Sequence, residues 1–267
     1  MSDKLKYLYR AYRYRLRVDP AELRFVSAKL CPGQVAVDVG CHKGAYTYWM
    51  RRRVGRTGKV YAFEPQPRQV DYLSRAFAAM RYDNVTLVPM GLSSAPGQLP
   101  LHIPAGAGMT HAATFEVRSE ERGARSEQVA FCSSILDPRS SLLIPVTTLD
   151  AFFADQPRGP AFIKIDVEGH ESAVLDGARH TLERHRPAIL IECESRHRAD
   201  RDVQTVFDFL QSLGYTGSFF HNGHRRPIAE FNPSEHQQIE PASDRPRSGY
   251  VNNFAFERPA RKIVPQT

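Results

Sequence analysis

The chain has 267 residues, of which 42% are hydrophobic, so it can bury one sizeable core, and one elaborated domain is the simplest expectation. No apolar run approaches the roughly 18 residues of a transmembrane helix, and the basic amino end lacks the apolar stretch and cleavage site of a signal peptide, so we expect a cytoplasmic protein. The four cysteines have neither C-x-x-C spacing nor a paired-histidine pattern, which argues against a zinc cluster or a disulfide framework.

Most of the formal net charge of +7 lies in residues 1–17, which hold six Lys or Arg side chains and one Asp. Apolar side chains recur there at helical spacing, which predicts a basic amphipathic helix; they are Leu5, Leu8, Tyr9, Tyr12 and Leu16. Two interpretations stay open. The helix is a lid or homodimer element whose aromatic stripe packs on the domain, or it contacts an anionic membrane surface or nucleic acid. A second predicted helix, from Pro20 to about Leu30, completes an N-terminal segment 1–34.

Residues 35–39 form a short, largely β-branched run, which predicts a buried parallel strand with Asp38 near its carboxyl end. Gly40 and Gly44 then form a turn that leads into a helix. Such a turn lets the backbone approach a bound nucleoside and directs the amino end of the helix toward polar ligand groups. The spacing is not the G-x-G-x-x-G of dinucleotide sites, so it favours a ligand without phosphates, such as S-adenosylmethionine, over a nicotinamide cofactor.

A second predicted strand, residues 59–63, ends in Glu64 and Pro65. An acidic side chain at the tip of the neighbouring strand can accept both hydrogen bonds from the hydroxyls of a ribose, so Asp38 and Glu64 fit a nucleoside-binding pair. A third predicted strand, residues 85–88, is followed by Gly91 and Leu92. These two residues are candidate neighbours of the adenine, although a plain turn at the strand end is an alternative.

Residues 92–147 interrupt this alternation of strand and helix with glycines and prolines, which predicts an antiparallel hairpin excursion over the site, including a polar loop at 118–127. The alternation returns with a capped helix after Thr148 and a fourth parallel strand at 162–166. The chain then predicts a helix to about Leu182, a fifth strand at 188–191, a helix at 200–213, and two further strands from 215 and from 250.

The chain carries four motifs in this order: VDVGCHKG at 37–44, FEP at 63–65, VTTLD at 146–150 and IKIDVEGHE at 163–171. Over roughly residues 35–257 the chain resembles the FkbM-type methyltransferases, a branch of the class I S-adenosylmethionine-dependent family. The resemblance implies an α/β, Rossmann-like domain with a mostly parallel seven-stranded sheet, helices on both faces and one antiparallel strand, followed by a tail at 258–267. It also implies O-methylation of a hydroxyl on a sugar, glycan or secondary metabolite.

The resemblance also assigns cofactor contacts. Asp38, Gly40 and Gly44 would form the wall for methionine and ribose, Glu64 would hold the ribose, and Asp166 would lie near the transferred methyl group. Cys41 and Pro65, which lie in the same motifs, are counted with these cofactor neighbours. Many relatives have Ala-Asn where this chain has Cys41 and His42, and an acidic residue where it has Ser93 and Ser94.

Methyl transfer to an alcohol requires a base or a metal ion. Asp166 and Glu192 follow the fourth and fifth strands, which are adjacent in the expected sheet, and His170 has a suitable intrinsic pKa for a proton acceptor. An alternative is that Glu168 and His170 only cap the following helix. Asp166, Glu168 and Glu192 could instead hold Mg²⁺, since an oxygen-rich set suits a hard cation; we favour the metal-free base.

Other functions remain as alternatives. A nucleic-acid amino-methyltransferase would carry N/D-P-P-Y/F after strand four, and a C5-methyltransferase would need a Pro-Cys pair, which the chain lacks. A basic RNA-binding or membrane-surface module on a Rossmann-like scaffold would need basic patches interleaved with aromatic residues in the core domain. Outside residues 1–17 the basic cluster is Arg51–Arg53, so there is no strong nucleic-acid signal. The expected partner is a small-molecule or glycan acceptor.

Overall fold

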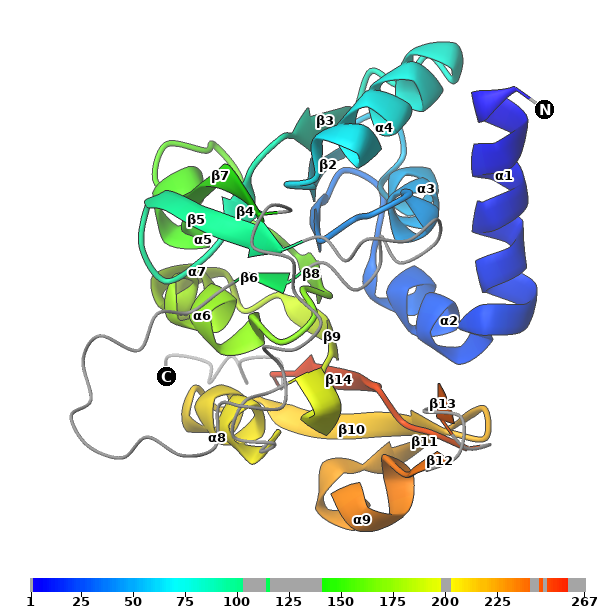
Figure 1. The fold of residues 1–267 in the computed structure, drawn as a ribbon. Coiled ribbons are helices and arrows are strands. Elements are labelled where there is room, and N and C mark those ends of the chain that lie inside the picture. The colour runs from blue at the N-terminus through cyan, green and yellow to red at the C-terminus, as the bar shows by residue number, and fades with distance from the viewer. Residues whose placement is uncertain are drawn as a thin grey trace, which may run out of the picture.

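The structure is a computed structural model that describes residues 2–102, 114–115, 141–197, 203–240, 245–246 and 249–258. A twisted sheet in the order β11-β10-β14-β9-β8-β1-β2-β3 forms its centre (Figure 1). The strands are β1 (Val35–Val39), β2 (Lys59–Phe63), β3 (Val85–Val88), β8 (Phe162–Ile165), β9 (Ala188–Glu192), β10 (Thr216–His221), β11 (His224–Pro227) and β14 (Asn253–Glu257).

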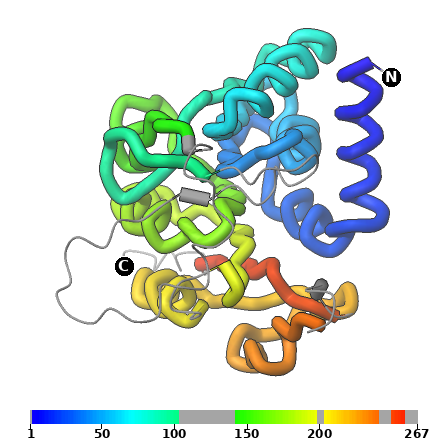
Figure 2. The backbone as a smooth tube through the Cα atoms, viewed as in Figure 1, coloured from blue at the N-terminus to red at the C-terminus, as the bar shows by residue number. Residues whose placement is uncertain are grey.

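Five of these strands, from β3 to β9, are parallel, and β14 is antiparallel to both β9 and β10. The tube in Figure 2 shows the red C-terminal strand lying between the yellow segments of β9 and β10. Every residue of β1 and β8 is buried, as the apolar runs predict for central parallel strands. The expected α/β architecture is therefore confirmed.

The sheet has eight strands instead of the expected seven, because β11 extends it as the second strand of a hairpin. Asn222 and Gly223 join β10 to β11, and both have positive φ, 51° and 77°. Two such residues suit the tight primed turns whose twist matches that of a hairpin. The sequence analysis did not predict a strand at residues 224–227.

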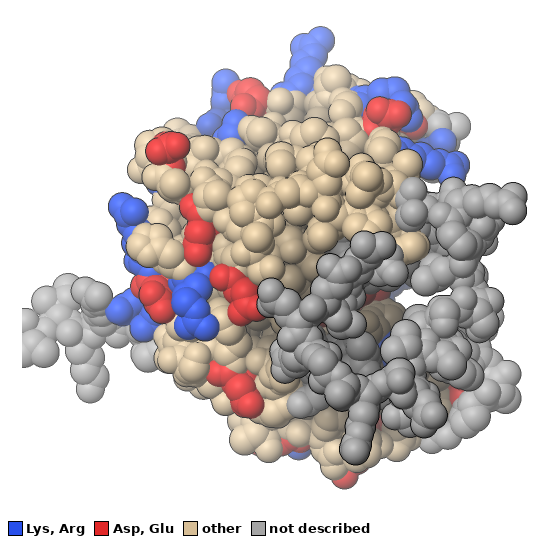
Figure 3. All heavy atoms as spheres, turned by 60° about the vertical axis from the view of Figure 1, so that its left-hand side comes forward, with Lys and Arg blue, Asp and Glu red and all other residues tan. Residues whose placement is uncertain are grey.

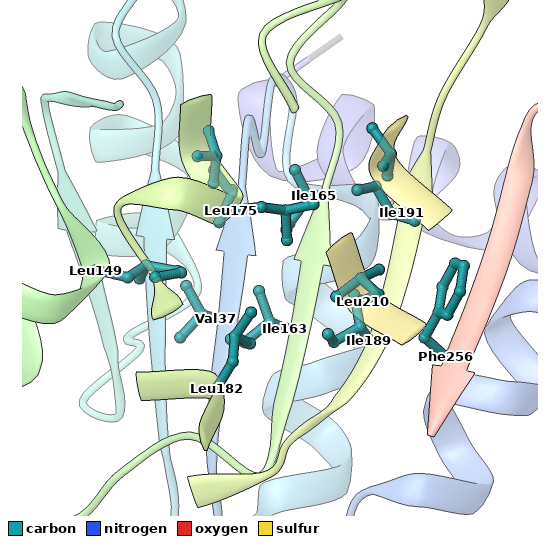
Figure 4. Packing of buried hydrophobic residues seen from close by; sticks show 14 of the residues in the cluster. Val37, Leu149, Ile163, Ile165, Leu175, Leu182, Ile189, Ile191, Leu210 and Phe256 are labelled. Atoms are coloured by element: carbon teal, nitrogen blue, oxygen red, sulfur yellow. The ribbon is translucent and has the colours of Figure 1, made fainter. Parts of the chain in front are cut away.

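Two helical layers cover the sheet. On one face Val37, Ile163 and Ile189 pack with helices α5 (Leu149–Phe153), α6 (Glu171–Asp176), α7 (Arg179–His185) and α8 (Gln204–Ser212) (Figure 4). On the other face Ala36, Phe162 and Leu190 pack with α2 (Pro20–Lys29) and α3 (Ala45–Val54), while α4 (Pro67–Ala79) lies beside α3. This second face also carries the polar side chains of the candidate site.

The N-terminal segment forms α1 (Asp3–Arg13), which runs along α3 and α4 at the edge of the domain, and a π-helix η1 (Tyr14–Val18), which packs on α2 (Figure 1). Its packing face is centred on Tyr7 and Ala11, both fully buried. Tyr7 makes edge contacts with Tyr48, Phe77 and Tyr82. Of the expected apolar stripe, Leu8 and Tyr12 contact the domain, and the Tyr12 ring lies 5.3 Å from that of Trp49. The other three residues, Leu5, Tyr9 and Leu16, are exposed, so only part of the stripe packs as predicted.

The excursion after β3 forms a second sheet in the order β4-β7-β5-β6. Its strands are β4 (Gly91–Leu92), β5 (Gly97–His102), β6 (Thr114–Phe115) and β7 (Ser141–Thr147), and β5 pairs antiparallel with β7 as expected. The predicted polar loop at 118–127 and all but the first residue of the predicted tail 258–267 lie outside the described residues.

The helix expected to run to Leu182 is two helices, α6 and α7, separated at Gly177 and Ala178. A Cβ at Gly177 would lie 2.1 Å from the carbonyl oxygen of Ser93, so the residue after β4 approaches too closely there for any other side chain. Smaller elements near the carboxyl end are 3₁₀ turns at Ser195–His197 and Ile228–Glu230, α9 (Pro233–His236), β12 (Ile239–Glu240) and β13 (Arg245–Pro246). No helix in the described part of the chain is both long enough and apolar enough to span a bilayer.

Candidate active site

A cavity opens at the carboxyl ends of β1, β8 and β9, under the N-terminal segment. The β strands and their turns contribute Gly40 to Lys43, Lys164, Asp166 and Glu192, and α3 contributes Ala45 and Tyr46. The N-terminal segment contributes Arg10, Tyr14, Val18 and Asp19, and Asn252 comes from the residue before β14. The cavity therefore joins parts of the chain that are far apart in sequence.

Strand register explains why these side chains share one face. Asp38 is the partner of Lys164 across β1 and β8, and Lys164 is the partner of Leu190 in β9. Asp166 and Glu192 each lie two residues further along, and side chains two apart in a strand point to the same side. The sequence prediction that Asp166 and Glu192 meet at one edge of the sheet agrees with this arrangement.

Lys164 and Asp166 form a nearly buried ion pair, with 2.7 Å between Nζ and Oδ2. Burial would lower the pKa of Lys164, but the charges of Asp166 and Asp38 outweigh it and raise that pKa. The Lys164 ammonium also lies over the ring of Tyr46, at 5.1 Å. Lys164 thus stays charged and fixes the position of the Asp166 carboxylate.

Glu192 is the second carboxylate of the cavity, and its Oε1 accepts a hydrogen bond from Nδ2 of Asn252 at 2.7 Å. Burial, followed by the charges of Asp166 and Glu168, holds the pKa of Glu192 well above its ordinary value. A carboxylate in this position is short of positive charge, so a cationic ligand would stabilise it.

Asp19 is a third acid in the cavity, and sequence reasoning missed it. Its Oδ2 accepts a hydrogen bond from the Tyr46 hydroxyl at 2.9 Å, and burial raises its pKa to about 6. Arg10 and Lys43 add positive charge to the same cavity, and burial followed by Arg10 lowers the pKa of Lys43. Arg10 and Asp19 reach the site only because α1 and η1 fold back onto α3, so no local motif could have revealed them.

Asp38 is fully buried beneath the glycine turn. Its Oδ2 accepts a hydrogen bond from the Thr47 hydroxyl at 2.5 Å, while its Oδ1 has no hydrogen-bond partner among the described residues. An unpaired buried carboxylate oxygen is costly. Asp38 nevertheless lies outside the cavity lining. Its predicted role in cofactor binding stays a prediction.

Gly40 and Gly44 are both required by contacts within the protein. Gly40 has a φ of +70°, and a Cβ there would lie 1.9 Å from the carbonyl oxygen of Asp166. Gly44 has a φ of +76°, and its Cβ would lie 2.7 Å from the Tyr7 ring and 2.9 Å from Leu73. In the sequence these glycines predict the close approach of a ligand, whereas in the structure neighbouring protein atoms already occupy the space.

Glu64 is buried at the tip of β2, as expected, and both its oxygens accept backbone hydrogen bonds. Oε2 accepts from the N–H of His42 at 2.7 Å, and Oε1 accepts from the N–H of Gln66 at 2.9 Å. Burial nevertheless raises the pKa of Glu64 to about 7. Each oxygen keeps a second lone pair, so it can still accept a hydrogen bond from a ribose hydroxyl.

His170 and Glu168 do not line the cavity that holds Asp166. Nε2 of His170 lies 3.0 Å from the Ser93 hydroxyl, and burial lowers its pKa to about 4. Glu168 pairs with Nδ1 of His197 at 2.8 Å. Across the described residues, no three His, Cys, Asp or Glu side chains form a group that could hold a metal ion.

The remaining predicted cofactor neighbours divide into two groups. Cys41 lines the cavity, and burial raises the pKa of its thiol well above its ordinary value, so it stays a neutral thiol. Gly91 and Leu92 are buried in β4, where they pair with β7, and Pro65 follows Glu64 on the turn into α4. Gly91, Leu92 and Pro65 lie outside the cavity lining.

Five parallel strands, an antiparallel strand inserted beside them and helices on both faces define the class I methyltransferase fold. Residues 38–216 match the family model described as the methyltransferase FkbM domain, and the chain belongs to this family.

A solved structure supports the fold. The chain is similar to the methyltransferase FkbM from Methylobacillus flagellatus KT, with 15% identity and a TM-score of 0.50, over 96% of this chain and 55% of that chain. It thus spans little more than half the length of that protein. It is also similar to a SAM dependent methyltransferase from Aquifex aeolicus, with 16% identity and a TM-score of 0.45, over 96% and 98% of the two chains. A comparison with curated proteins gives no match.

Proposed function

We propose that the protein is an S-adenosylmethionine-dependent O-methyltransferase that acts on a hydroxyl group of a sugar, glycan or other small molecule. The observation that carries the proposal is the cavity in which Asp19, Asp166 and Glu192 face one space at the carboxyl ends of the central strands. In an open α/β sheet, ligands gather at this edge.

The residues present fit the chemistry of this cofactor. S-adenosylmethionine carries a sulfonium and an ammonium group, which would stabilise the carboxylates of Asp19 and Glu192, and a carboxylate, which suits Arg10 or Lys43. Burial raises the pKa of both acids even though Lys164 is near, so a cationic ligand group beside them would favour their charged forms. When bound, the cofactor supplies an electrophilic methyl group.

The protein must then align the acceptor oxygen and take up its proton. Asp166 is suited to this role because Lys164 fixes its carboxylate while a quarter of its side-chain surface stays exposed. Glu192, held by Asn252, faces the same cavity. His170 is less suited, because it does not line the cavity and its Nε2 lies against the Ser93 hydroxyl at 3.0 Å. A hydroxyl acceptor is favoured by IDVEGH after β8, where nucleic-acid amino-methyltransferases carry N/D-P-P-Y/F.

Calorimetric titration with S-adenosylhomocysteine tests the cofactor assignment. We expect binding to the wild-type protein, and we expect Glu64→Gln to weaken it about tenfold or more, because a neutral amide cannot accept both ribose hydrogen bonds. Lys59→Gln, at the opposite end of the same strand, serves as the control and should bind normally. A folded wild-type protein that binds no S-adenosylhomocysteine would sink the proposal.

A further inference from the structure

The outward side of α1 and η1 exposes apolar side chains in a row. Among the described residues, seven large hydrophobic side chains are exposed, and five of these lie in this one segment. Leu5, Tyr9, Tyr12 and Leu16 are spaced by four, three and four residues, and their exposed fractions are 55%, 64%, 45% and 71%. This spacing places them on one side of a helix. We call these four residues the outer face.

The helix that carries the outer face is firmly attached to the domain, so loose attachment does not explain the exposure. Tyr7 and Ala11 on the opposite side are fully buried, and the indole N–H of Trp49 donates to the carbonyl of Ala11 at 2.9 Å. Arg15 donates to the carbonyl of Leu23 at 2.9 Å, which ties η1 to α2. Tyr12 lies at the border of the outer face, since its ring contacts that of Trp49 at 5.3 Å. The domain therefore holds the helix by one side and leaves Leu5, Tyr9 and Leu16 exposed on the other.

Basic residues flank the outer face. Lys4, Lys6, Arg13 and Arg17 are all exposed. The one acidic residue of the segment, Asp3, is engaged elsewhere, since its Oδ2 pairs with Arg75 of α4 at 2.8 Å. On the side of the molecule shown in Figure 3, by contrast, Lys and Arg side chains are interspersed with Asp and Glu.

This combination matches the interface of an anionic bilayer. Leucine side chains enter the boundary between acyl chains and headgroups, and tyrosine rings favour the same depth. Lysine and arginine extend their charged ends to lipid phosphates while their stems cover apolar surface. The helix lies along the edge of the domain (Figure 1), so it can lie flat on such a surface without unfolding.

Two other partners fit less well. In a two-fold homodimer the same surface meets itself, so Lys6, Arg13 and Arg17 of one copy would approach their counterparts with no acidic residue of the segment free to compensate. For nucleic acid, the centre of the surface would be expected to carry the cations that contact phosphates. Here apolar side chains occupy the centre and the cations lie at its sides.

We propose that the outer face, with its flanking Lys and Arg residues, docks the protein on an anionic lipid surface. This inference stands apart from the proposed function, because it uses neither the cofactor nor the acceptor.

Point substitutions test the proposal better than truncation, because Tyr7, Arg10 and Tyr14 of the same segment pack in the core or line the cavity. Sedimentation with vesicles of phosphatidylcholine, with and without phosphatidylglycerol, measures binding of the full chain. We expect binding only to the anionic vesicles. The triple variant Leu5→Ser, Tyr9→Ser, Leu16→Ser should reduce partitioning at least about tenfold, since each large apolar side chain contributes to burial.

A second variant, in which Lys6, Arg13 and Arg17 become Gln, should bind more weakly and lose the salt sensitivity that the wild type shows. The pair Leu142→Ser, Leu143→Ser serves as a matched control, because these residues are exposed by 45% and 67% but lie on β7. This control should bind vesicles normally. Unchanged thermal unfolding and S-adenosylhomocysteine affinity would show that each variant folds.

The proposal is overturned if the folded wild type ignores anionic vesicles, or if the triple variant binds them as well as the control does. Sedimentation equilibrium and RNA binding are measured on the same proteins. A dimer that the triple variant dissociates, without vesicle binding by the wild type, would identify the outer face as a homodimer interface. RNA binding that replaces vesicle binding would identify a nucleic-acid surface.

Discussion

Lys164 lies in the central strand β8, and Asp166 follows the end of that strand. The side chains of a buried parallel strand are otherwise expected to be apolar. Ile163 and Ile165 pack in the core on the opposite face. The strand thus uses one face for packing and the other for the cavity, and the ion pair between Lys164 and Asp166 avoids the cost of leaving either charge buried alone.

Asp166→Asn should lower turnover by about 10²-fold or more, because the amide cannot accept the proton of the acceptor hydroxyl. Binding of S-adenosylhomocysteine and the circular dichroism spectrum should stay close to those of the wild type. Glu168→Gln is the matched control, since its partner His197 lies outside the cavity lining. Turnover of Asp166→Asn within a few-fold of wild type would contradict the assignment. Activity that EDTA abolishes and Mg²⁺ restores, together with loss in Glu168→Gln, would favour the metal alternative.

Part of this site could be predicted from the sequence, for a physical reason. Asp38, Asp166 and Glu192 stand at the ends of short apolar runs, and parallel strands bring such ends together. Arg10 and Asp19 have no comparable local signal, because their places depend on how α1 and η1 dock on the domain. Lys164 sat within a recognised motif, but only its burial and its partner identify it as part of the site.

At the scale of elements, the docking of α1 depends on Gly44. The Tyr7 ring fills the space directly beside this glycine, which begins α3 in a left-handed conformation. The turn that was interpreted as a ligand cradle is therefore also the seat of the N-terminal helix. The two elements are 37 residues apart at these positions, so only the folded structure reveals the contact.

Gly44→Ala should lower the free energy of unfolding by about 1–2 kcal/mol from the left-handed backbone alone, with a further loss from displacement of Tyr7. Urea denaturation measures the change. Gly97→Ala is the control, because no atom lies within 4 Å of its Cβ position, and it should change stability by about 0.5 kcal/mol or less. If the effect of Gly44→Ala is the same in a Tyr7→Ala background, the contact between the two residues does not account for the further loss.

Most strands could be predicted, because each parallel strand is a short apolar run closed by a turn residue. The missed strand β11 has the sequence HRRP, which shows no apolar alternation. Its stability comes from distant partners, since Arg225 pairs with Glu257 of β14. The Asn222-Gly223 pair was a usable local signal for the hairpin. The single long helix after β8 was wrong because the close approach of Ser93, the residue after β4, to Gly177 is a tertiary contact.

At the scale of the whole molecule, buried acids link stability to pH. Burial raises the pKa of Glu64 from 4.5 to about 7. Between these values the folded protein holds a proton that the unfolded chain has released, so stability falls as the pH rises from about 4.5 to 7. At about 1.4 kcal/mol per pKa unit, the titration of Glu64 alone lowers the free energy of unfolding by on the order of 3 kcal/mol across this pH interval. Burial lowers the pKa of His42 from 6.5 to about 3. The contribution of His42 to stability therefore rises as the pH rises between these two values.

Glu64→Gln isolates the acid, because all other groups are common to both proteins. We expect the stability of the variant relative to wild type to increase as the pH rises from about 4.5 to 7, and to stay constant above that interval. Urea denaturation across this range measures it. A difference that does not vary with pH would show that Glu64 titrates alike in the folded and unfolded chains.

The two sides of α1 are under different evolutionary constraints. Substitutions at Tyr7 and Ala11 alter the core and the glycine turn, whereas substitutions at Leu5, Tyr9 and Leu16 touch only the surroundings. In a saturation library over residues 3–18 that is selected for folded protein alone, the positions that tolerate polar residues should therefore recur with the period of a helix. Lineages of this chain could change where the protein resides by drifting on one side of the helix, without altering the chemistry on the other.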